Sequence, residues 1–336
     1  MKRSPSLEGF LALLGEFPQK TPLNARVLSE HSLDGITRRL IDYSTERDER
    51  VQAYLLLPNG NLERKPAVLA IHQDGERRPY EYGGSEPAGV AGDRELQYGL
   101  ELCLRGYVVI CPDRFPFGSR SLAKSKHKET FAQFRVSTSY GGRDVDLTED
   151  LYRGCVANRL LVEGRTALGK ELYELQRAVD YLCSLPEVDN NRIGAIGHSA
   201  GGFLSALLMY IDSRIKVGCA SSGTFLVRWV YGQDYLKPIN GFGSMLVVPG
   251  LTQWGDMDDV LAGLAPRPFL ETHGDFTQEM VDEKSRKARE RYRESGVPER
   301  YESVVYDAKA HVFRKDMRER AYEWFDHWLK GERAGE

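Results

Sequence analysis

The sequence predicts an α/β fold with a mostly parallel central sheet flanked by helices, and two patterns support this. Continuous short apolar runs, typical of strands that are covered on both faces, recur at 67–71, 107–111, 192–196, 215–220, 268–272 and 301–306. Helical periodicity separates them, at about 94–105, 165–185, 200–211, 279–294 and 315–330. Strand–helix alternation of this kind favours parallel strands with helices on both faces of the sheet.

The first part of the chain has a different pattern. Residues 5–17 have the apolar spacing of a short helix, whereas residues 35–57 alternate with a period of two around a polar turn at 44–50. This predicts an antiparallel hairpin that leads into the sheet. We therefore expect one domain over 1–336, in which residues 1–30 form an N-terminal helical extension.

Two long connections interrupt the alternation, at 73–93 and at 222–265. Both follow the predicted carboxyl end of a strand, which is where α/β proteins form ligand sites. Long connections inside compact domains are usually functional. The second one is rich in large aromatic residues, namely Trp229, Tyr231, Tyr235, Phe242 and Trp254. We expect residues 222–265 to form a cap or a pocket wall, although aromatic residues also build cores.

The composition is that of an ordinary globular protein. Hydrophobic residues make up 41% of the 336 residues, and the net charge of −3 gives no electrostatic reason for binding nucleic acid or a membrane. The apolar stretch at 10–14 is too short for a signal peptide, and no stretch has membrane-spanning length. The five cysteines form no CxxC pair, as expected for reduced thiols. We expect a cytoplasmic protein that acts on a small molecule, and the sequence leaves a homo-oligomer open.

Residues 197–202, which read GHSAGG, contain the pattern G-x-S-x-G. The pattern alone is weak, because it arises by chance in on the order of one chain in five. Here it follows a predicted strand and opens a predicted helix, the setting of a nucleophile elbow. A serine hydroxyl on so tight a turn needs small neighbours, and Gly197 and Gly201 provide them. Ser199 is therefore the candidate nucleophile, and the alternative is an incidental serine in a tight turn.

A serine hydroxyl needs a base, and in this arrangement the base follows the nucleophile and the acid along the chain. His273, His311 and His327 lie downstream of Ser199. His311 stands in a loop between the last predicted strand and the last helix, where it could lean over the edge of the sheet. His327 lies on a helix face and is expected to pack there, and His273 ends a strand. We predict His311 as the base.

The base must be oriented by a carboxylate. Asp275 follows the predicted strand 268–272 on a short turn, at the correct end of the sheet. Three other acids compete, namely Glu271 within that strand, Asp282 in the following helix and Asp307 close to the base. We predict Asp275 as the acid, with a helix N-cap as its alternative role.

Negative charge develops on the carbonyl oxygen of an ester under attack, so the site needs hydrogen-bond donors. The backbone N–H of Ala200 should supply one. The second should come from residues 72–75, HQDG, after the predicted strand 67–71. We predict the Gln73 N–H, with Asp74 as the next candidate and a plain turn as the alternative.

No feature of the sequence indicates a metal or a cofactor. Asp144, Asp146, Glu149 and Asp150 form an acidic cluster without the spacing of a ligand loop, which favours a solvated face or a helix start. Zinc-type histidine spacing, a GKS/T phosphate loop and GxGxxG are all missing from the chain.

Taken together, these motifs resemble the α/β-hydrolase superfamily, and within it the dienelactone-hydrolase-related, acetyl-xylan-esterase-like branch. The likeness spans about residues 30–330. It depends on the segments 53–58, 72–75, 106–109, 112–114, 117–118, 180–182, 188–189, 197–202, 265–268 and 311–313. The resemblance implies metal-free hydrolysis of esters or lactones, with Ser199, Asp275 and His311 as the triad. Dienelactone hydrolases proper use cysteine where this chain has Ser199. Similar proteins also often have a longer acid loop than 274–277, one that ends in an aromatic–proline pair.

We therefore expect a serine carboxylic-ester hydrolase that acts through an acyl-enzyme on a small ester, such as an acetyl or short acyl ester of a sugar, or a lactone. The alternative enzyme is a peptidase or amidase of the prolyl-oligopeptidase type, which this sequence disfavours because no propeller segment precedes the domain. A catalytically silent ligand-binding homologue is the alternative outside enzymes.

Overall fold

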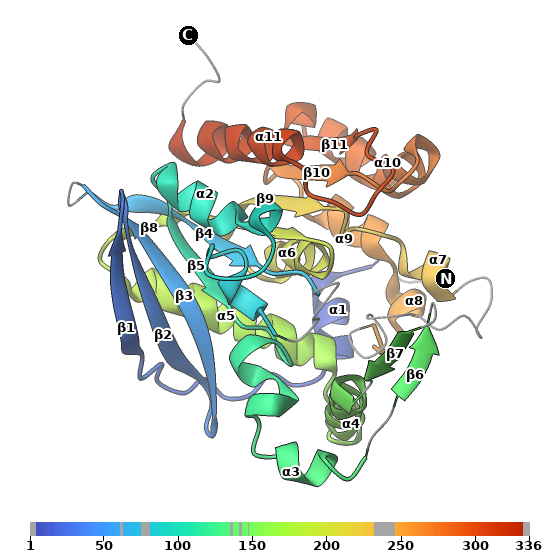
Figure 1. The fold of residues 1–336 in the computed structure, drawn as a ribbon. Coiled ribbons are helices and arrows are strands. Elements are labelled where there is room, and N and C mark those ends of the chain that lie inside the picture. The colour runs from blue at the N-terminus through green and yellow to red at the C-terminus, as the bar shows by residue number, and fades with distance from the viewer. Residues whose placement is uncertain are drawn as a thin grey trace.

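One nine-stranded sheet runs through the molecule, which is known from a computed structural model (Figure 1). The structure describes residues 5–60, 63–74, 81–134, 137–140, 143–146, 148–231 and 246–331. In spatial order the strands are β1 Arg26–Leu33, β2 Ile36–Glu46, β3 Glu49–Pro58, β5 Val108–Pro112, β4 Lys65–Ile71, β8 Val188–His198, β9 Ile215–Ser221, β10 Phe269–His273 and β11 Tyr301–Val305. A separate hairpin consists of β6 Ser137–Tyr140 and β7 Arg143–Asp146.

The sheet is antiparallel at its N-terminal side and parallel elsewhere. β1, β2 and β3 pair antiparallel, β3 also pairs antiparallel with β5, and the pairs from β5 to β11 are parallel. The chain order changes direction at β4, which lies between β5 and β8. A crevice forms outside the carboxyl ends of the strands at such a switch point, and ligands bind there in open α/β sheets.

Helices cover both faces of this sheet (Figure 1). They are α1 Leu7–Leu14, α2 Tyr98–Leu104, α3 Lys128–Phe131, α4 Thr148–Val162, α5 Ala167–Ser184, α6 Ala200–Ile211, α7 Val227–Tyr231, α8 Leu251–Trp254, α9 Met257–Gly263, α10 Gln278–Glu294 and α11 Lys315–Phe325. Single 3-10 turns occupy Gly83–Ser85, Arg94–Leu96, Gly118–Arg120, Leu122–Lys124 and Pro298–Arg300, and a π-helical turn, Asp326–Lys330, follows α11.

Two hydrophobic cores result, one on each face of the sheet. Alternate residues of β4 show the division, because Leu69 and Ile71 join the core under α5 and α6, whereas Val68 and Ala70 join the core under α2 and α11. This alternation follows from the two-residue period of a strand. The central strands are buried on both faces, as their continuous apolar runs predicted.

The predicted architecture is confirmed, and the structure adds several elements to it. β1 was not predicted, and neither were the β6–β7 hairpin and α4. α4 begins at Thr148 with Glu149 and Asp150 in its first turn, so this half of the acidic cluster is a helix start. The side chains of Asp144 and Asp146 lie outside the described ones.

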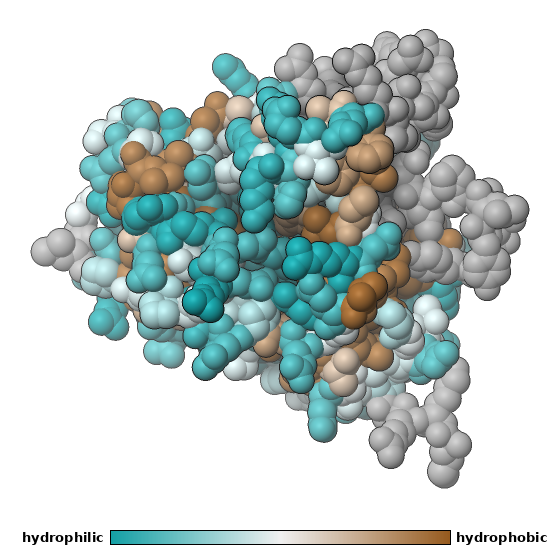
Figure 2. Space-filling model, turned by 90° about the horizontal axis from the view of Figure 1, so that it is seen from below, coloured by the Kyte–Doolittle hydropathy of each residue, from teal (hydrophilic) through white to brown (hydrophobic). Residues whose placement is uncertain are grey.

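One face of the described surface is largely polar. Figure 2 shows hydrophilic residues over most of the face seen from below, with apolar residues gathered in separate patches. No helix among the described residues has both the length and the apolarity that crossing a bilayer requires. All five cysteines are free thiols, as expected; Cys103, Cys111 and Cys219 are buried, Cys183 is half-buried and Cys155 is exposed.

Candidate active site

Ser199 occupies a sharp corner between β8 and α6. Its backbone has φ 53° and ψ −124°, a conformation that a residue with a side chain rarely adopts and that indicates a functional constraint. A Cβ added at Gly197 would overlap the backbone of Gly201, and a Cβ added at Gly201 would overlap the carbonyl oxygen of Ile71. The two glycines are therefore required by close backbone approach, as the GHSAGG pattern predicted.

Neighbouring strands hold this corner in place. The Ser199 N–H donates to the carbonyl of Ser221 at 2.7 Å, and the Ser199 carbonyl accepts from the N–H of Phe203 at 3.0 Å. A Cβ at Gly223 would overlap the Ser199 carbonyl oxygen, so the loop after β9 passes directly against the corner. The strained conformation of Ser199 is thus enforced from β9 as well as from its own turn.

The predicted base and acid meet beside this corner. His311 Nδ1 lies 2.7 Å from Asp275 Oδ2, and both residues are exposed at the surface. Asp275 follows β10 through Gly274, and the N–H of Ala310 donates to the Gly274 carbonyl at 3.2 Å, so the two loops are also tied by their backbones. The N-cap of α10 is Thr277, whose side chain accepts from the N–H of Met280. Asp275 is therefore not a helix cap.

The Asp275 carboxylate is held in its charged form. Burial acts to raise the pKa of Asp275, but the hydrogen bond from His311 and the charge of that ring outweigh it, and a hydrogen bond from the Ser222 side chain adds to them. The pKa of Asp275 therefore lies below its usual value. A carboxylate in this state can fix the tautomer of the imidazole and stabilise the imidazolium.

The ring of His198 links this pair to the corner. His198 directly precedes Ser199, and its ring centroid lies 4.8 Å from that of His311. The imidazole of His311 therefore packs against the residue next to Ser199. Ser199, Asp275 and His311 come from three separate strand ends, and the fold brings all three to one edge of the sheet.

The predicted donors of the oxyanion site lie at the switch point. Ala200 is the first residue of α6, so its N–H has no partner within the helix. Gln73 follows β4, and the contact of Gly201 with the carbonyls of Ile71 and His72 places α6 directly against this segment. Neither N–H has a hydrogen-bond partner among the described residues. Gly75 lies outside the described residues.

His72 and Arg114 fix the segment that carries Gln73. His72 Nε2 accepts the N–H of Arg114 at 3.0 Å, so Nδ1 carries the ring proton and donates to the Gln73 carbonyl at 2.7 Å. Burial lowers the pKa of His72 to about 3, with the charge of Arg114 as the next cause. The ring therefore stays neutral, and both of its nitrogens hold the backbone around Gln73.

Buried charges surround the same segment. The Arg114 guanidinium donates to the His72 carbonyl at 2.9 Å and pairs with Asp74 at 3.1 Å and Glu171 at 3.1 Å. Arg153 of α4 pairs with Asp74 at 3.5 Å and with Glu171 at 3.7 Å. Two cations thus face two carboxylates. This pairing compensates the charges of the arginines and of Glu171, which are almost completely buried.

The alternative acids and bases have other roles. Glu271 is fully buried and pairs with Lys284 at 2.5 Å. Asp282 pairs with Arg289 on α10, and Asp307 is exposed beside Lys309. His273 is buried in β10, with Nε2 3.2 Å from Ser303 Oγ, and His327 packs edge-on against Trp328 at 4.5 Å.

The aromatic residues of 222–265 divide between the core and the region of the acid. Trp254 packs on Phe10 and donates to the Ser6 carbonyl, which makes it part of the core under α1. Trp229 packs edge-on against Phe276 at 6.2 Å, next to Asp275. Tyr235 and Phe242 lie outside the described residues, as does the side chain of Tyr231.

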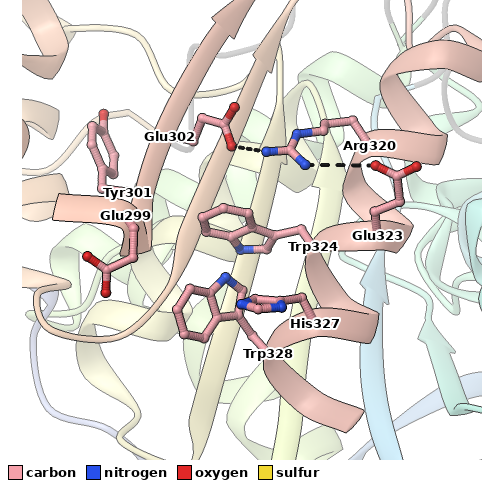
Figure 3. A pocket seen from close by; sticks show the side chains of 8 residues that line it. All are labelled: Glu299, Tyr301, Glu302, Arg320, Glu323, Trp324, His327 and Trp328. Carbon is pink, nitrogen blue, oxygen red and sulfur yellow. Dashed lines mark hydrogen bonds and ion pairs between the residues drawn. The ribbon is translucent and has the colours of Figure 1, made fainter. Parts of the chain in front are cut away.

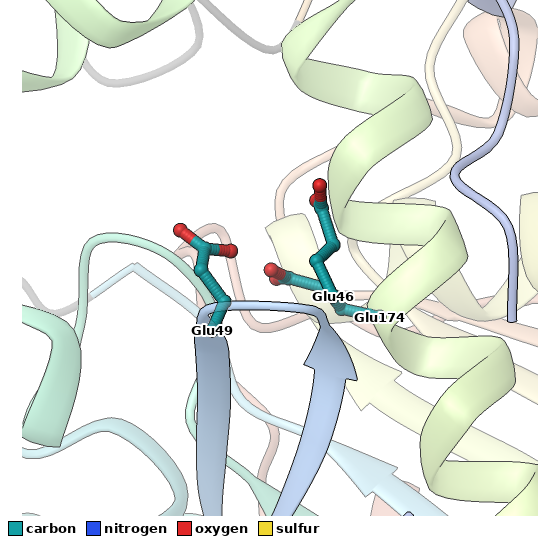
Figure 4. A group of neighbouring side chains, drawn as sticks. All are labelled: Glu46, Glu49 and Glu174. Atoms are coloured by element: carbon teal, nitrogen blue, oxygen red, sulfur yellow. The ribbon is translucent and has the colours of Figure 1, made fainter. Parts of the chain in front are cut away.

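A carboxylate cluster elsewhere has its charges already compensated. Glu46, Glu49 and Glu174 converge at the β2–β3 turn (Figure 4). Lys170 pairs with all three of them, and Arg120 pairs with Glu49 and Glu174. Protein cations thus take the place that a metal ion would need.

One groove of the described surface lies away from the corner that holds Ser199. It has a volume of about 450 Å³ and lies between β11 and the last helical turns, where Arg320 reaches both Glu302 and Glu323 (Figure 3). Trp324, His327 and Trp328, from the same helical stretch as Arg320 and Glu323, also line it. Glu299 and Tyr301 line the groove at the start of β11, whereas His311 follows the end of that strand, so the groove and His311 lie toward opposite ends of β11.

Sequence reasoning missed the residues that position the site. Ser222 is in contact with both Gly274 and Asp275, and its only signal is its place directly after β9. Arg114 belongs to a quoted motif, but its contacts with His72 and Asp74 depend on tertiary structure that spacing does not reveal.

Comparisons with known proteins agree with this fold. The family model described as the prolyl oligopeptidase family matches residues 162–332. YtaP of Bacillus subtilis (strain 168), a provisionally named hydrolase, is 26% identical over 324 residues, which is 94% of this chain and 96% of YtaP.

Two solved structures have the same fold over nearly the whole chain. A provisionally named acetyl xylan esterase from Bacteroides fragilis has a TM-score of 0.70 and 18% identity, covering 90% of this chain and 74% of its own. A glucuronoyl esterase from Solibacter usitatus has a TM-score of 0.63 and 16% identity, covering 95% and 91%. The predicted likeness to acetyl-xylan-esterase-like α/β-hydrolases is confirmed at the level of the fold.

Proposed function

Because the chain belongs to the prolyl oligopeptidase family and is an esterase-like α/β-hydrolase, we propose that it cleaves small carboxylic esters with Ser199 as nucleophile, His311 as base and Asp275 as acid. The observation that carries this proposal is the 2.7 Å contact of His311 Nδ1 with Asp275, beside the strained corner that holds Ser199. With Nδ1 engaged, Nε2 of His311 is the nitrogen left for the serine hydroxyl.

The reaction proceeds in two steps. Ser199 Oγ bonds to the ester carbonyl carbon while His311 takes the hydroxyl proton, and the N–H groups of Ala200 and Gln73 stabilise the oxyanion. The carbon–oxygen bond to the alcohol then breaks, and the alcohol leaves with the proton from His311. Water next attacks the acyl group and gives its proton to His311, which returns a proton to Ser199 as the carboxylic acid departs.

The substrate class that we favour is an acetyl or short acyl ester, including esters of sugars. The fold relatives named as acetyl xylan and glucuronoyl esterases support a sugar ester. Trp229 and Phe276, which pack together beside Asp275, offer an aromatic surface on which a sugar ring could stack. A lactone, an intramolecular ester, would react by the same steps.

The test is a panel of p-nitrophenyl acetate, longer acyl esters, acetylated xylo-oligosaccharides and lactones, assayed with the wild type and Ser199→Ala. We expect Ser199→Ala to lose about a thousandfold or more in kcat with an unchanged melting temperature. Ser213→Ala is the matched control, since Ser213 is exposed on a turn after α6. Turnover by Ser199→Ala at the wild-type rate would refute the proposal.

Family membership supports a second candidate, a peptidase or amidase. The same site could attack an amide, with His311 delivering the proton to the leaving amine. Prolyl and other aminoacyl p-nitroanilides would distinguish the two. Cleavage of these amides at a higher kcat/KM than any ester of the panel would make the chain a peptidase, and binding of esters without turnover would make it a silent homologue.

A further inference from the structure

His198 is a buried histidine beside the proposed site that the two-step mechanism does not use. It ends β8, and only 3% of it is exposed. We propose that His198 is a positioning residue, which holds the backbone and the ring of His311 in place for proton transfer. The inference rests on the proposed function and goes beyond it.

The contacts of the His198 ring point to this role. Its Nδ1 lies 3.2 Å from Ser221 Oγ on the neighbouring strand β9. The backbones of Ser221 and His311 also act on the ring as hydrogen-bond partners, and with Nδ1 at Ser221 we assign Nε2 to the His311 carbonyl. One face of the ring packs against the imidazole of His311 with planes 39° apart, and the ring is stacked on Phe313 at 5.9 Å with planes 9° apart.

The base needs such an anchor because its own loop is short of buried contacts. Asp307, Lys309, Ala310 and His311 are exposed. The backbone bond from Ala310 to Gly274 holds one side of the loop, and Phe313, which is buried, holds its end. His198 is the buried ring that contacts both His311 and Phe313, so it connects the base to the rigid sheet.

The charge state of His198 also fits this role. Burial lowers its pKa to about 3, with the charge of His311 as the next cause, and Asp275 acts in the opposite direction. The hydroxyl of Tyr98, from α2, faces the His198 backbone. A ring that stays neutral does not repel the imidazolium that forms on His311, so its hydrogen bond persists through the catalytic cycle.

Two substitutions separate positioning from simple packing. The amide nitrogen of glutamine reaches about as far as Nε2 of histidine, whereas that of asparagine reaches about as far as Nδ1. His198→Gln can therefore keep the bond to the His311 carbonyl, and His198→Asn can keep only the contact with Ser221. Both remove the ring and the stacking on Phe313, so they form a matched pair.

We would measure kcat and KM for p-nitrophenyl acetate, and the melting temperature, for the wild type, His198→Gln, His198→Asn and Ser199→Ala. The expected result is that His198→Asn loses on the order of tenfold to a hundredfold in kcat at constant KM, because a misplaced base slows the chemical step. His198→Gln should recover most of this loss, although both variants should melt at similar temperatures.

Equal kcat values in the two variants would overturn the inference, and so would a loss of kcat that follows the melting temperature. Ser199→Ala keeps this result separate from the proposed function. If Ser199→Ala is inactive while both His198 variants match the wild type, only the positioning role fails. If Ser199→Ala stays active, the proposed mechanism fails, and the positioning role that rests on it fails too.

Discussion

His311 Nδ1 lies 2.7 Å from Asp275 Oδ2, although β11 and its loop separate the two residues from one another in the chain. Replacing Asp275 with asparagine keeps the shape of the side chain but offers an amide where the imidazole needs an acceptor. We expect Asp275→Asn to lower kcat for p-nitrophenyl acetate by about 10³- to 10⁴-fold, because the wrong tautomer of His311 is favoured. Steady-state kinetics beside the melting temperature checks this, and a kcat within a factor of about three of wild type would assign the orienting role to another acid.

The tight turn at Ser199 requires glycine at position 201. Gly201→Ala should destabilise the fold and abolish activity, because its new methyl group would overlap the carbonyl oxygen of Ile71. Gly154→Ala is the matched control, since Gly154 lies inside α4 with open space around it. Alanine there should raise the free energy of unfolding by about 0.5–1 kcal/mol. Urea denaturation measures the free energy of unfolding of both variants. A Gly201→Ala protein as stable as the wild type would contradict the close approach of Gly201 to the Ile71 carbonyl.

The buried carboxylate Glu174 predicts a dependence of stability on pH. Burial acts to raise its pKa, but the charges of Arg120 and Lys170 outweigh this and lower the pKa from 4.5 to about 2. Because the pKa of Glu174 is lower in the folded state than in the unfolded chain, its charged carboxylate stabilises the fold fully above pH 4.5. This stabilisation is lost as the pH falls towards 2.

Glu174→Gln should therefore be less stable than the wild type at pH 7 by a few kcal/mol, and the difference should shrink between pH 4.5 and 2. Chemical denaturation at pH 7, 4.5 and 3 would follow it. A difference that stays constant with pH would mean that the carboxylate contributes no charge interaction.

The ion pairs of Arg114 hold the segment that carries Gln73, so we expect them to contribute to the stability of the fold. Arg114→Met fills a similar volume but leaves Glu171 and Asp74 with weaker compensation, and it frees the His72 carbonyl. Breaking a buried ion pair from one side costs about 3–5 kcal/mol. We expect a loss of that order in urea denaturation. The double variant Arg114→Met with Glu171→Gln should recover part of it, and a further loss there would show that the charges do not interact.

The strands of the parallel sheet could be predicted, and the catalytic residues could be proposed from the sequence, because their signals are local. β4 and β5 are continuous apolar runs, and the turn at Ser199 needs glycines at fixed spacing. β1 gave no such signal, because seven of its eight residues are exposed and neither face needs apolar side chains. α4 was missed because its buried positions include Arg153, whose partner Asp74 lies far away in the sequence.

The contacts of Ser222 and His198 with the proposed acid and base could not be predicted for a related reason. Ser222 has a polar side chain of ordinary appearance, and its contact with Asp275 exists only once β9 and β10 are paired. The ring of His198 is next to Ser199 in sequence, but that it faces His311 depends on how the last loop returns to the sheet.

The place of β4 at the switch point has a consequence for any attempt to shorten the protein. The stretch recognised by the family model, 162–332, contains Ser199, Asp275 and His311, but it begins after β4, β5 and the segment of Gln73. A fragment cut to that stretch would expose the flank of β8 that β4 covers and would keep only one of the two proposed N–H donors. The segment that the family model matches is therefore shorter than the segment that we expect to fold and to turn over substrate.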